Sequence, residues 1–353
     1  MKKIIIADIH SNNNNGICTG HYIPLARMFQ GMFDKVVPTR VASGPIYQKS
    51  FGKEHLIQLP YDMIAGANFL INRIKAMINS YVLFTEAKGD TIILQDGRPV
   101  TNHSGIALFY LGKSKLYLIK YTTNGLNSSM GRFLWKMIKN RVDGIICPND
   151  EVGKAFGRPY CVVPDYIYTG EDKKCPVDYK SKTYDFCIVG RLNKDKGVVE
   201  SARRLNGTKY KVLIAGQAND SYSEVLKKAC HGCDNIDLRL GYVSDEDYIR
   251  YINESRYCIL NYQGEYSNRS SGVVFDIIFS GVPVVGNSCK ALQFVKDYEI
   301  GHIYDNIDEL SAEGLFDEKK YEIYLDNICK YRQLHSEYYK KLSTFVGVKD
   351  KNL

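Results

Sequence analysis

The chain has 353 residues, of which 44% are hydrophobic and 24% charged, the composition of a globular protein with more than one hydrophobic core. No run approaches the roughly 18 uncharged apolar residues of a membrane span, and the first residues lack the pattern of a secretory signal. Several of the ten cysteines lie in strand-like runs, as expected of free thiols in a reducing compartment, so we expect a cytoplasmic protein. The length of the chain suggests two domains.

The net charge of +8 is distributed unevenly along the chain. Residues 1–167 hold 20 Lys and Arg against 11 Asp and Glu, and residues 168–353 hold 27 against 28, so the halves carry +9 and −1. A one-sided field of this kind attracts an anionic surface or ligand. No helix-turn-helix, RNP-like or zinc-finger pattern accompanies it, so we expect an anionic membrane surface and not nucleic acid as the partner.

Short apolar runs alternate with amphipathic stretches through the first half of the chain. Strands are expected in residues 2–9, 91–95, 116–121 and 143–148, and helices in residues 20–33, 131–142 and 149–157. This alternation predicts a parallel sheet covered by helices.

A second series of the same kind begins after residue 183. Strands are expected in residues 184–190, 210–216, 236–243, 257–262 and 283–287, each separated from the next by a helical segment. Three prolines and a charge cluster mark a linker near residues 164–182. We therefore predict an N-terminal Rossmann-like domain of residues 1–167, a C-terminal one of residues 168–318, and a terminal helix in 319–353 that crosses back to the N-domain.

The loop after the first strand, "HSNNNNGICTGHYIPLA", contains Gly16 and Gly20. Glycines allow backbone to approach a ligand closely, and Asn tolerates left-handed conformations. The spacing is not the Gly-x-Gly-x-x-Gly of dinucleotide-binding folds, so a dehydrogenase is disfavoured. A long turn without a ligand would have the same composition.

The strand in "YDFCIVGRLNKDKGV" ends at Gly190 and is followed by Arg191 and Lys196. Ligands bind at the carboxyl ends of parallel strands, and two cations on a glycine-bounded loop suit a diphosphate. A solvated charged turn is the alternative interpretation.

Two further turns follow later strands. Ser244 and Asp247 form a helix-start signature just after Tyr242 and Val243, which would lie at the sheet edge where they could hold a base.

In "NYQGEYSNRSSGVVFDIIFSGVPVVGN", Ser270, Ser271 and Gly272 precede an apolar helix whose free N–H groups can bind an anion. Asp276 lies inside that apolar helix and needs solvent, a partner or a ligand hydroxyl.

At these residues the sequence resembles the retaining GT-B glycosyltransferases of family 4, or group 1, which include bacterial mannosyl-, glucosyl- and rhamnosyltransferases. "GRLNKDKG" is similar to the family's diphosphate loop, which implies that Arg191 and Lys196 hold the donor diphosphate. The carboxylate motif keeps its spacing at Asp276, which would bind the donor ribose, whereas Asn268 stands where the family has its first Glu.

In the first half, "GICTGHYIPLA" resembles the family's glycine loop followed by a His, here His21. A second His of the family is missing, and Tyr121 or Thr122 occupies its region. His21, Tyr121 and Thr122 are therefore the catalytic candidates that the resemblance implies, and none of them can be assigned from the sequence.

The resemblance implies an α/β protein with two Rossmann-like domains facing across a cleft. It implies a metal-independent, retaining hexosyltransferase without a cofactor, acting in bacterial surface glycan synthesis. The donor would be a UDP-, GDP- or dTDP-linked sugar, and the acceptor a saccharide or a polyprenyl-diphosphate-linked saccharide. A sugar-nucleotide epimerase or phosphorylase of the same fold, or a non-catalytic subunit that binds sugar nucleotide, stays open as an alternative.

The segment "SSMGRFLWKMIKNRV" at residues 128–142 interleaves basic and apolar residues. Such a helix is typical of docking on the inner face of the cell membrane, although a core helix with a basic outer face has the same pattern. Cys230 and Cys233 have the spacing of half a zinc site, but no second pair follows, so we expect no metal.

Overall fold

The computed structural model describes residues 4–10, 25–26, 29, 36–41, 57–61, 69–168, 179–268, 271–312 and 316–347, with the backbone alone at 36–41, 265 and 268. The chain divides into two compact units. Unit 1 comprises residues 1–169 and 336–353, and unit 2 comprises residues 170–335.

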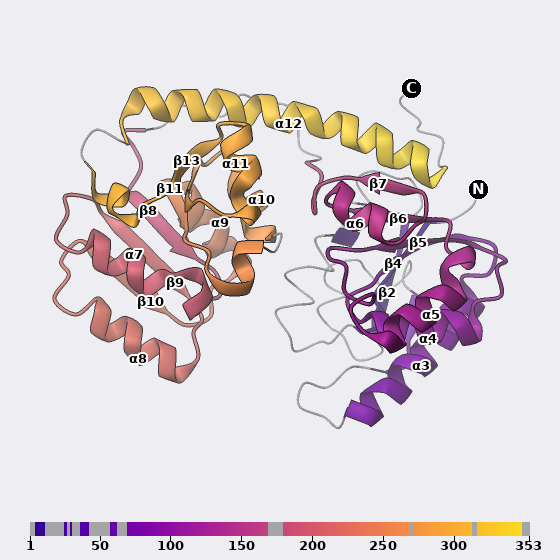
Figure 1. The fold of residues 1–353 in the computed structure, drawn as a ribbon. Coiled ribbons are helices and arrows are strands. Elements are labelled where there is room, and N and C mark those ends of the chain that lie inside the picture. The colour runs from indigo at the N-terminus through magenta and orange to yellow at the C-terminus, as the bar shows by residue number, and fades with distance from the viewer. Residues whose placement is uncertain are drawn as a thin grey trace. The chain divides into compact units, whose positions relative to one another are not determined.

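Unit 1 is built on a parallel sheet of seven strands in the order β3-β2-β1-β4-β5-β6-β7. The strands are β1 (Ile4–Ala7), β2 (Val36–Val41), β3 (Ile57–Leu59), β4 (Thr91–Gln95), β5 (Lys115–Ile119), β6 (Gly144–Cys147) and β7 (Tyr160–Val162). Its helices include α3 (Phe69–Glu86), α4 (Pro99–Phe109), α5 (Ser129–Ile138) and α6 (Asp150–Ala155), with a 3-10 turn η2 (Lys139–Arg141) after α5. The helices α3, α4 and α5 lie side by side (Figure 1).

Unit 2 has a parallel sheet of six strands in the order β10-β9-β8-β11-β12-β13. The strands are β8 (Tyr184–Val189), β9 (Val212–Gly216), β10 (Ile236–Leu240), β11 (Ser255–Leu260), β12 (Val284–Asn287) and β13 (Gly301–Tyr304). The helices are α7 (Val198–Leu205), α8 (Asp220–Ala229), α9 (Asp245–Asn253), α10 (Gly272–Phe279) and α11 (Gln293–Asp297). Short 3-10 turns are η3 (Lys194–Lys196), η4 (Gly264–Asn268), η5 (Lys290–Leu292) and η6 (Ile307–Ser311).

The strands near the middle of each sheet are almost wholly buried, which explains their continuous apolar runs. All four residues of β1 and all five of β9 are buried. Strands covered by helices on both faces need apolar residues at successive positions instead of alternate ones. The predicted α/β fold with two parallel sheets is confirmed.

The long helix α12 (Glu318–Val346) is shared by the two units. Within unit 2, its Arg332 donates to the carbonyl oxygens of Ile278 (2.9 Å) and Phe279 (2.7 Å), which satisfies the last turn of α10. Within unit 1, its Phe345 packs edge-on against Tyr117, whose hydroxyl donates to the Phe345 carbonyl at 3.1 Å. Among the described helices, none has both the length and the apolar character that crossing a bilayer requires.

Candidate functional site

The sheet of unit 2 has a switch point between β8 and β11. From β8 the chain proceeds to β9 and β10 on one side, and from β11 it proceeds to β12 and β13 on the other. The loops that leave β8 and β11 therefore diverge, and open α/β sheets bind ligands in the crevice at this point.

The loop after β8 is shaped by two glycines. Gly190 has φ of +100° and Gly197 has φ of +53°, a region of backbone conformation that favours glycine. Asn261, just beyond β11, donates from Nδ2 to the Gly197 carbonyl at 3.2 Å, and a Cβ at Gly197 would lie 2.3 Å from that nitrogen. The two loops at the switch point are thus held in contact with each other.

Lys196 is the central charged group of this loop. Its side chain is 7% exposed, and burial, followed by the charge of Arg191, lowers its pKa to about 8. Within the described part of the chain, neither Lys196 nor the exposed Arg191 forms an ion pair or a side-chain hydrogen bond; the centroid of the Tyr266 ring lies 5.9 Å from Lys196 Nζ. A buried ammonium without a counterion is costly, so this site favours an anionic ligand.

Asp276 of α10 lies near the same loop. The Tyr248 hydroxyl on α9 donates to Asp276 Oδ2 at 3.1 Å, and burial raises the pKa of Asp276 to about 6. A Cβ at Gly190 would lie 3.7 Å from Tyr248 Cε2 and 3.9 Å from Lys196 Nζ. The predicted residues Lys196 and Asp276, 80 positions apart, are therefore brought to one site around Gly190 and Tyr248.

The start of α10 was predicted as an anion site, and the structure describes part of it. Ser271 precedes the first helical residue, Gly272, and its hydroxyl shares a hydrogen bond of 2.6 Å with Tyr262 instead of capping the helix. The backbone N–H groups of the first turn are therefore not capped by that side chain. Ser270 and the side chain of Asn268 lie outside the described residues.

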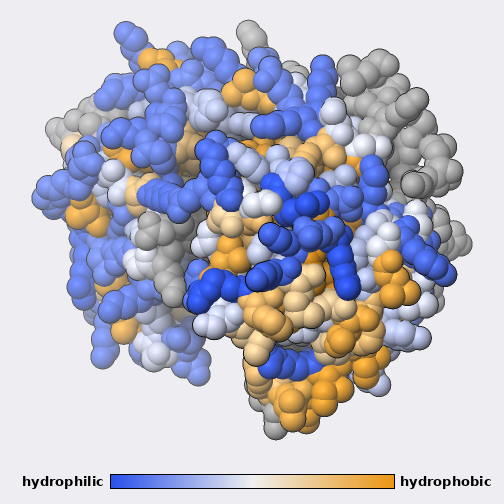
Figure 2. All heavy atoms as spheres, turned by 45° about the vertical axis from the view of Figure 1, so that its right-hand side comes forward, coloured by the Kyte–Doolittle hydropathy of each residue, from blue (hydrophilic) through white to orange (hydrophobic). Residues whose placement is uncertain are grey.

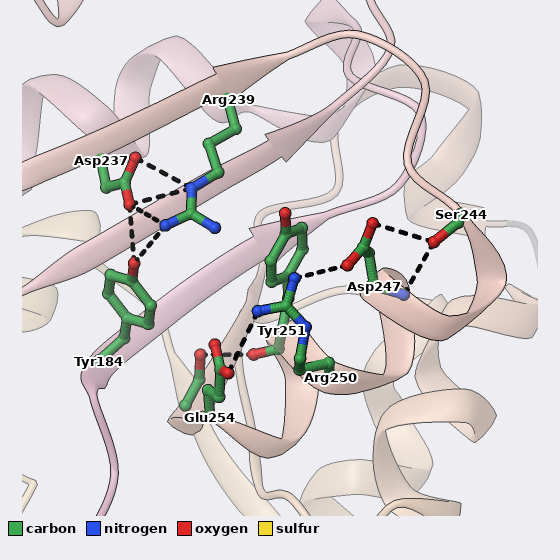
Figure 3. A network of polar contacts seen from close by, with 9 residues as sticks. Tyr184, Asp237, Arg239, Ser244, Asp247, Arg250, Tyr251 and Glu254 are labelled. Atoms are coloured by element: carbon green, nitrogen blue, oxygen red, sulfur yellow. Dashed lines mark hydrogen bonds and ion pairs between the residues drawn. The ribbon is translucent and has the colours of Figure 1, made fainter.

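The turn between β10 and α9 carries Tyr242 and Val243. Tyr242 is 85% exposed and Val243 is half-buried. Ser244 Oγ accepts from the Asp247 N–H at 3.0 Å, as the predicted helix start requires. Figure 3 shows the polar contacts around this turn.

A network of side chains fixes both ends of that turn. On the strand side, Arg239 binds Asp237 at 2.6 Å and the Tyr184 hydroxyl at 2.9 Å. On the helix side, Arg250 bridges Asp247 and Glu254 at 2.5 and 3.4 Å. The exposed ring of Tyr242 is thereby presented on a rigid support.

The corresponding sheet edge in unit 1 holds a buried charged cluster that the sequence analysis missed. Asp96 follows β4, Lys120 follows β5, and His103 lies on α4. Asp96 Oδ2 is 2.9 Å from His103 Nε2 and forms a closer ion pair with Lys120 Nζ, which holds the pKa of Asp96 well below its usual range despite burial. The signal that could have found it is the polar residue directly after each of two apolar strands.

The cluster continues to the end of β1 through an amide. Asn102 donates from Nδ2 to Asp96 Oδ1 at 2.8 Å, and its Oδ1 lies 2.7 Å from His10 Nε2. Burial lowers the pKa of His10 to about 4 and raises that of Asp8 to about 6. His10 is therefore neutral at pH 7.

The structure describes two of the three catalytic candidates, Tyr121 and Thr122. Tyr121 and Thr122 are half-buried beside Lys120, and Thr122 Oγ1 accepts from the Asn124 N–H at 3.2 Å. Gly16, Gly20 and His21 lie outside the described residues. Lys120, which directly precedes Tyr121 and Thr122, forms the ion pair with Asp96 in the buried cluster at this strand end.

Cys230 and Cys233, the pair with the spacing of half a zinc site, follow the end of α8. Cys230 is half-buried and Cys233 is buried, with Cys233 Sγ 3.7 Å from the Ala229 carbonyl. Among the described residues, no group of three or more His, Cys, Asp or Glu side chains could hold a metal ion.

No protein-family model matches the sequence, and no curated protein matches it. The fold has many solved counterparts, and it is the GT-B fold of the glycosyltransferases. At sequence identities of 9–13%, the likeness is one of fold.

Three solved structures represent these counterparts. AviGT4, a glycosyltransferase involved in avilamycin A biosynthesis, has a TM-score of 0.58 at 13% identity over 99% of this chain and 100% of its own. WaaG, a glycosyltransferase involved in lipopolysaccharide biosynthesis, has a TM-score of 0.60 at 13% identity over 98% and 100%. An E. coli structure described as trehalose-6-phosphate bound with UDP-2-fluoro glucose has a TM-score of 0.67 at 9% identity over 99% and 100%.

Proposed function

We propose that the protein is a glycosyltransferase that moves a hexose from a nucleoside diphosphate sugar to a saccharide or a lipid-linked saccharide. The observation that carries the proposal is Lys196, a buried ammonium at the switch point of unit 2 with no acidic partner among the described side chains, beside the exposed cation of Arg191. A diphosphate would supply the missing negative charge.

In this proposal Asp276 accepts hydrogen bonds from the ribose hydroxyls of the donor. Its carboxylate has one described donor, the Tyr248 hydroxyl at 3.1 Å, and so keeps capacity to accept others. Tyr242 and Val243 would contact the base. The fold counterpart that binds UDP-2-fluoro glucose supports a UDP-sugar as the first donor to try, with GDP- and dTDP-sugars next.

The proposed reaction breaks the bond between the anomeric carbon and the β-phosphate oxygen. The nucleoside diphosphate departs with the bonding electrons, an acceptor hydroxyl oxygen bonds to the anomeric carbon, and its proton is released. Arg191 and Lys196 would stabilise the charge that develops on the diphosphate. We further propose that the transfer retains the anomeric configuration and needs no metal, because the family resemblance implies both.

The biological setting that we propose is bacterial surface glycan synthesis on the cytoplasmic face of the membrane. The charge of +9 on residues 1–167 supports attraction to an anionic lipid surface, where a polyprenyl-diphosphate-linked acceptor would be found.

A melting-temperature screen against UDP, GDP, dTDP and their sugar conjugates tests the proposal. A ligand at 100 times its Kd stabilises the folded state by about 2.7 kcal/mol, so a true donor gives a clear rise in Tm. Incubation of that donor with acceptors should release nucleoside diphosphate in step with glycosylated product. Epimerised donor without acceptor would favour an epimerase, and no response to any nucleotide would contradict the proposal.

The role of Asn268 is tested with the same ligands. If this residue contacts only the sugar, Asn268→Ala changes the preference among donor sugars and leaves binding of the bare nucleoside diphosphate unchanged. Calorimetry with both ligands separates the two effects. Equal losses for both would show that the donor is placed wrongly.

A further inference from the structure

The helix α3 in unit 1 exposes an apolar stripe, although its inner face also buries apolar residues such as Leu83 and Phe84. Leu70, Ile74 and Ile78, one helical turn apart, are 63%, 54% and 37% exposed, whereas Asn79 and Ser80 on the opposite face are fully buried. A surface helix ordinarily buries its apolar stripe. This one turns an apolar stripe outward.

This orientation of α3 is fixed by specific contacts. Asn79 Nδ2 donates to the carbonyl oxygens of Tyr61 (2.8 Å) and Ile9 (3.2 Å), and Asn79 Oδ1 accepts from the Tyr61 N–H at 3.0 Å. Ser80 fits against Gly105 of α4, where a Cβ would lie 2.4 Å from Ser80 Oγ. Rotating α3 to bury its apolar stripe would break these contacts and leave the buried amide unsatisfied.

The neighbouring helices extend the exposed apolar face. Leu108 and Leu111 at the end of α4 are 65% and 79% exposed, and Phe133 on α5 is 60% exposed. A groove of about 330 Å³ runs along α3 and reaches Phe109 of α4. Figure 2 shows hydrophobic residues gathered at the lower edge of the view, where Figure 1 places α3. Exposed apolar faces of this kind mark protein or membrane interaction sites.

The charges around this face identify the occupant. The sequence has no Asp or Glu from Gly97 to Val142, a segment that includes α4 and α5 and eight Lys or Arg residues. On α3, Arg73 and Lys75 are basic, and Glu86 at the last position is the single acidic residue. Arg132, Lys136 and Lys139 are exposed. An apolar face with a mainly basic surround is complementary to anionic lipid head groups above an acyl layer.

We propose that α3, α4 and α5 seat unit 1 on an anionic phospholipid bilayer, with the stripe Leu70, Ile74 and Ile78 inserted among the acyl chains. The purpose of this membrane contact is access to a lipid-linked acceptor, and that purpose rests on the proposed function. It also corrects the residues expected from the sequence, because Leu134, Trp135 and Ile138 of α5 pack into the core and cannot insert. The inserting residues lie mainly on α3, a segment that the sequence analysis did not single out.

The test compares binding to vesicles of equal parts phosphatidylcholine and phosphatidylglycerol with binding to pure phosphatidylcholine vesicles, by co-sedimentation at low and high salt. Wild-type protein should bind the anionic vesicles, and high salt should weaken that binding without abolishing it. The triple variant Leu70→Ser/Ile74→Ser/Ile78→Ser should bind about tenfold or more weakly at both salt concentrations. Arg132→Gln/Lys136→Gln should weaken binding about several-fold at low salt only.

A matched control removes three exposed apolar side chains from unit 2: Val225→Ser/Ile249→Ser/Ile323→Ser, at residues that are 44%, 41% and 48% exposed. This control should bind vesicles as the wild type does. Equal binding by the α3 variant and the wild type would overturn the proposal. So would sedimentation velocity that shows a dimer abolished by the α3 substitutions, since the face would then belong to a second copy. The α3 substitutions should leave the affinity for the nucleoside diphosphate found in the melting-temperature screen unchanged, as measured by calorimetry. Loss of vesicle binding is thereby distinguished from failure of the proposed donor site.

Discussion

The carboxyl edges of the two sheets both carry buried lysines, but in opposite surroundings. In unit 1, Lys120 is paired with Asp96 and lies 3.3 Å from His103 Nε2, so the charges of the cluster neutralise one another. In unit 2, Lys196 is also buried, yet no described carboxylate lies within ion-pair distance. The first arrangement balances its own charge, as a structural ion pair does, whereas the second would be balanced by the anionic ligand that we propose.

The largest effect expected from this contrast is on the stability of unit 1. Asp96→Asn would leave the Lys120 ammonium buried without its counterion, and breaking a buried pair in this way costs about 3–5 kcal/mol. Chemical denaturation followed by the fluorescence of Trp135, which lies in unit 1, measures the loss. Asp96→Asn/Lys120→Met should recover much of it, because both charges are then gone. A single variant as stable as the wild type would show that the cluster is not a structural pair.

The next effect concerns the donor loop of unit 2. Lys196→Ala and Arg191→Ala should each weaken donor binding by about 1.5–3 kcal/mol, the scale of a charge-assisted hydrogen bond. Stability should fall little, and Lys196→Met should hold or raise Tm, because it removes a desolvated charge while keeping an apolar stem. Calorimetry and thermal melts on the same samples check both parts. Donor affinity that survives in both alanine variants would remove this loop from the binding site.

Asp276 gives an effect of similar or smaller size with a pH signature. Asp276→Asn should weaken donor and free nucleotide equally, by about 1–3 kcal/mol. Because burial raises the pKa of Asp276 to about 6, the carboxylate that accepts ribose hydroxyls is lost as the pH falls through 6. Wild-type affinity should therefore decline below that pH, and the Asn variant should lack this decline. A pH-independent wild-type affinity between 5 and 7 would contradict the role.

The smallest effect is a proton taken up on binding. With its pKa lowered to about 8, Lys196 is partly neutral near pH 8, and a bound diphosphate favours the ammonium form. Donor binding at pH 8 should therefore take up on the order of half a proton, seen as a dependence of the calorimetric heat on the ionisation enthalpy of the buffer. Lys196→Gln should abolish that dependence. Identical heats in all buffers would mean that the lysine does not meet the diphosphate.

The sequence was informative where the structure is repetitive. Buried parallel strands such as β1 and β9 have continuous apolar runs, so the central strands of both sheets could be predicted from the pattern alone. The strands β2, β3, β7 and β13 were not among those expected. Arg191 and Lys196 could be placed because they follow a strand end on a glycine-bounded loop. Their meeting with Asp276 around Gly190 and Tyr248 required the resemblance, since no local pattern relates residues so far apart.

The features that were not predicted are those in which polar residues are buried or apolar residues are exposed. The helix α3 has apolar residues outside and Asn79 inside, so its pattern does not indicate which face meets the sheet. The cluster of Asp96, His103 and Lys120 is assembled from separate elements without a sequence motif. The run "LYLIKY" predicts a strand that includes Lys120, because a buried charge cannot be distinguished from an exposed one until its partner is known.

The division of α12 between the units has a consequence for synthesis of the protein on the ribosome. Gly144 of β6 lies where a Cβ would meet the Phe345 ring at 2.3 Å, so the sheet of unit 1 is fitted to a side chain made some 200 residues later in the chain. Unit 2 is one continuous segment and has all its residues once His335 has been made. Although it comes second in the sequence, unit 2 can therefore be complete first, and unit 1 lacks the ring that packs against Tyr117 until Phe345 has been made. A nonsense mutation just after His335 would then damage the half of the protein that was translated first.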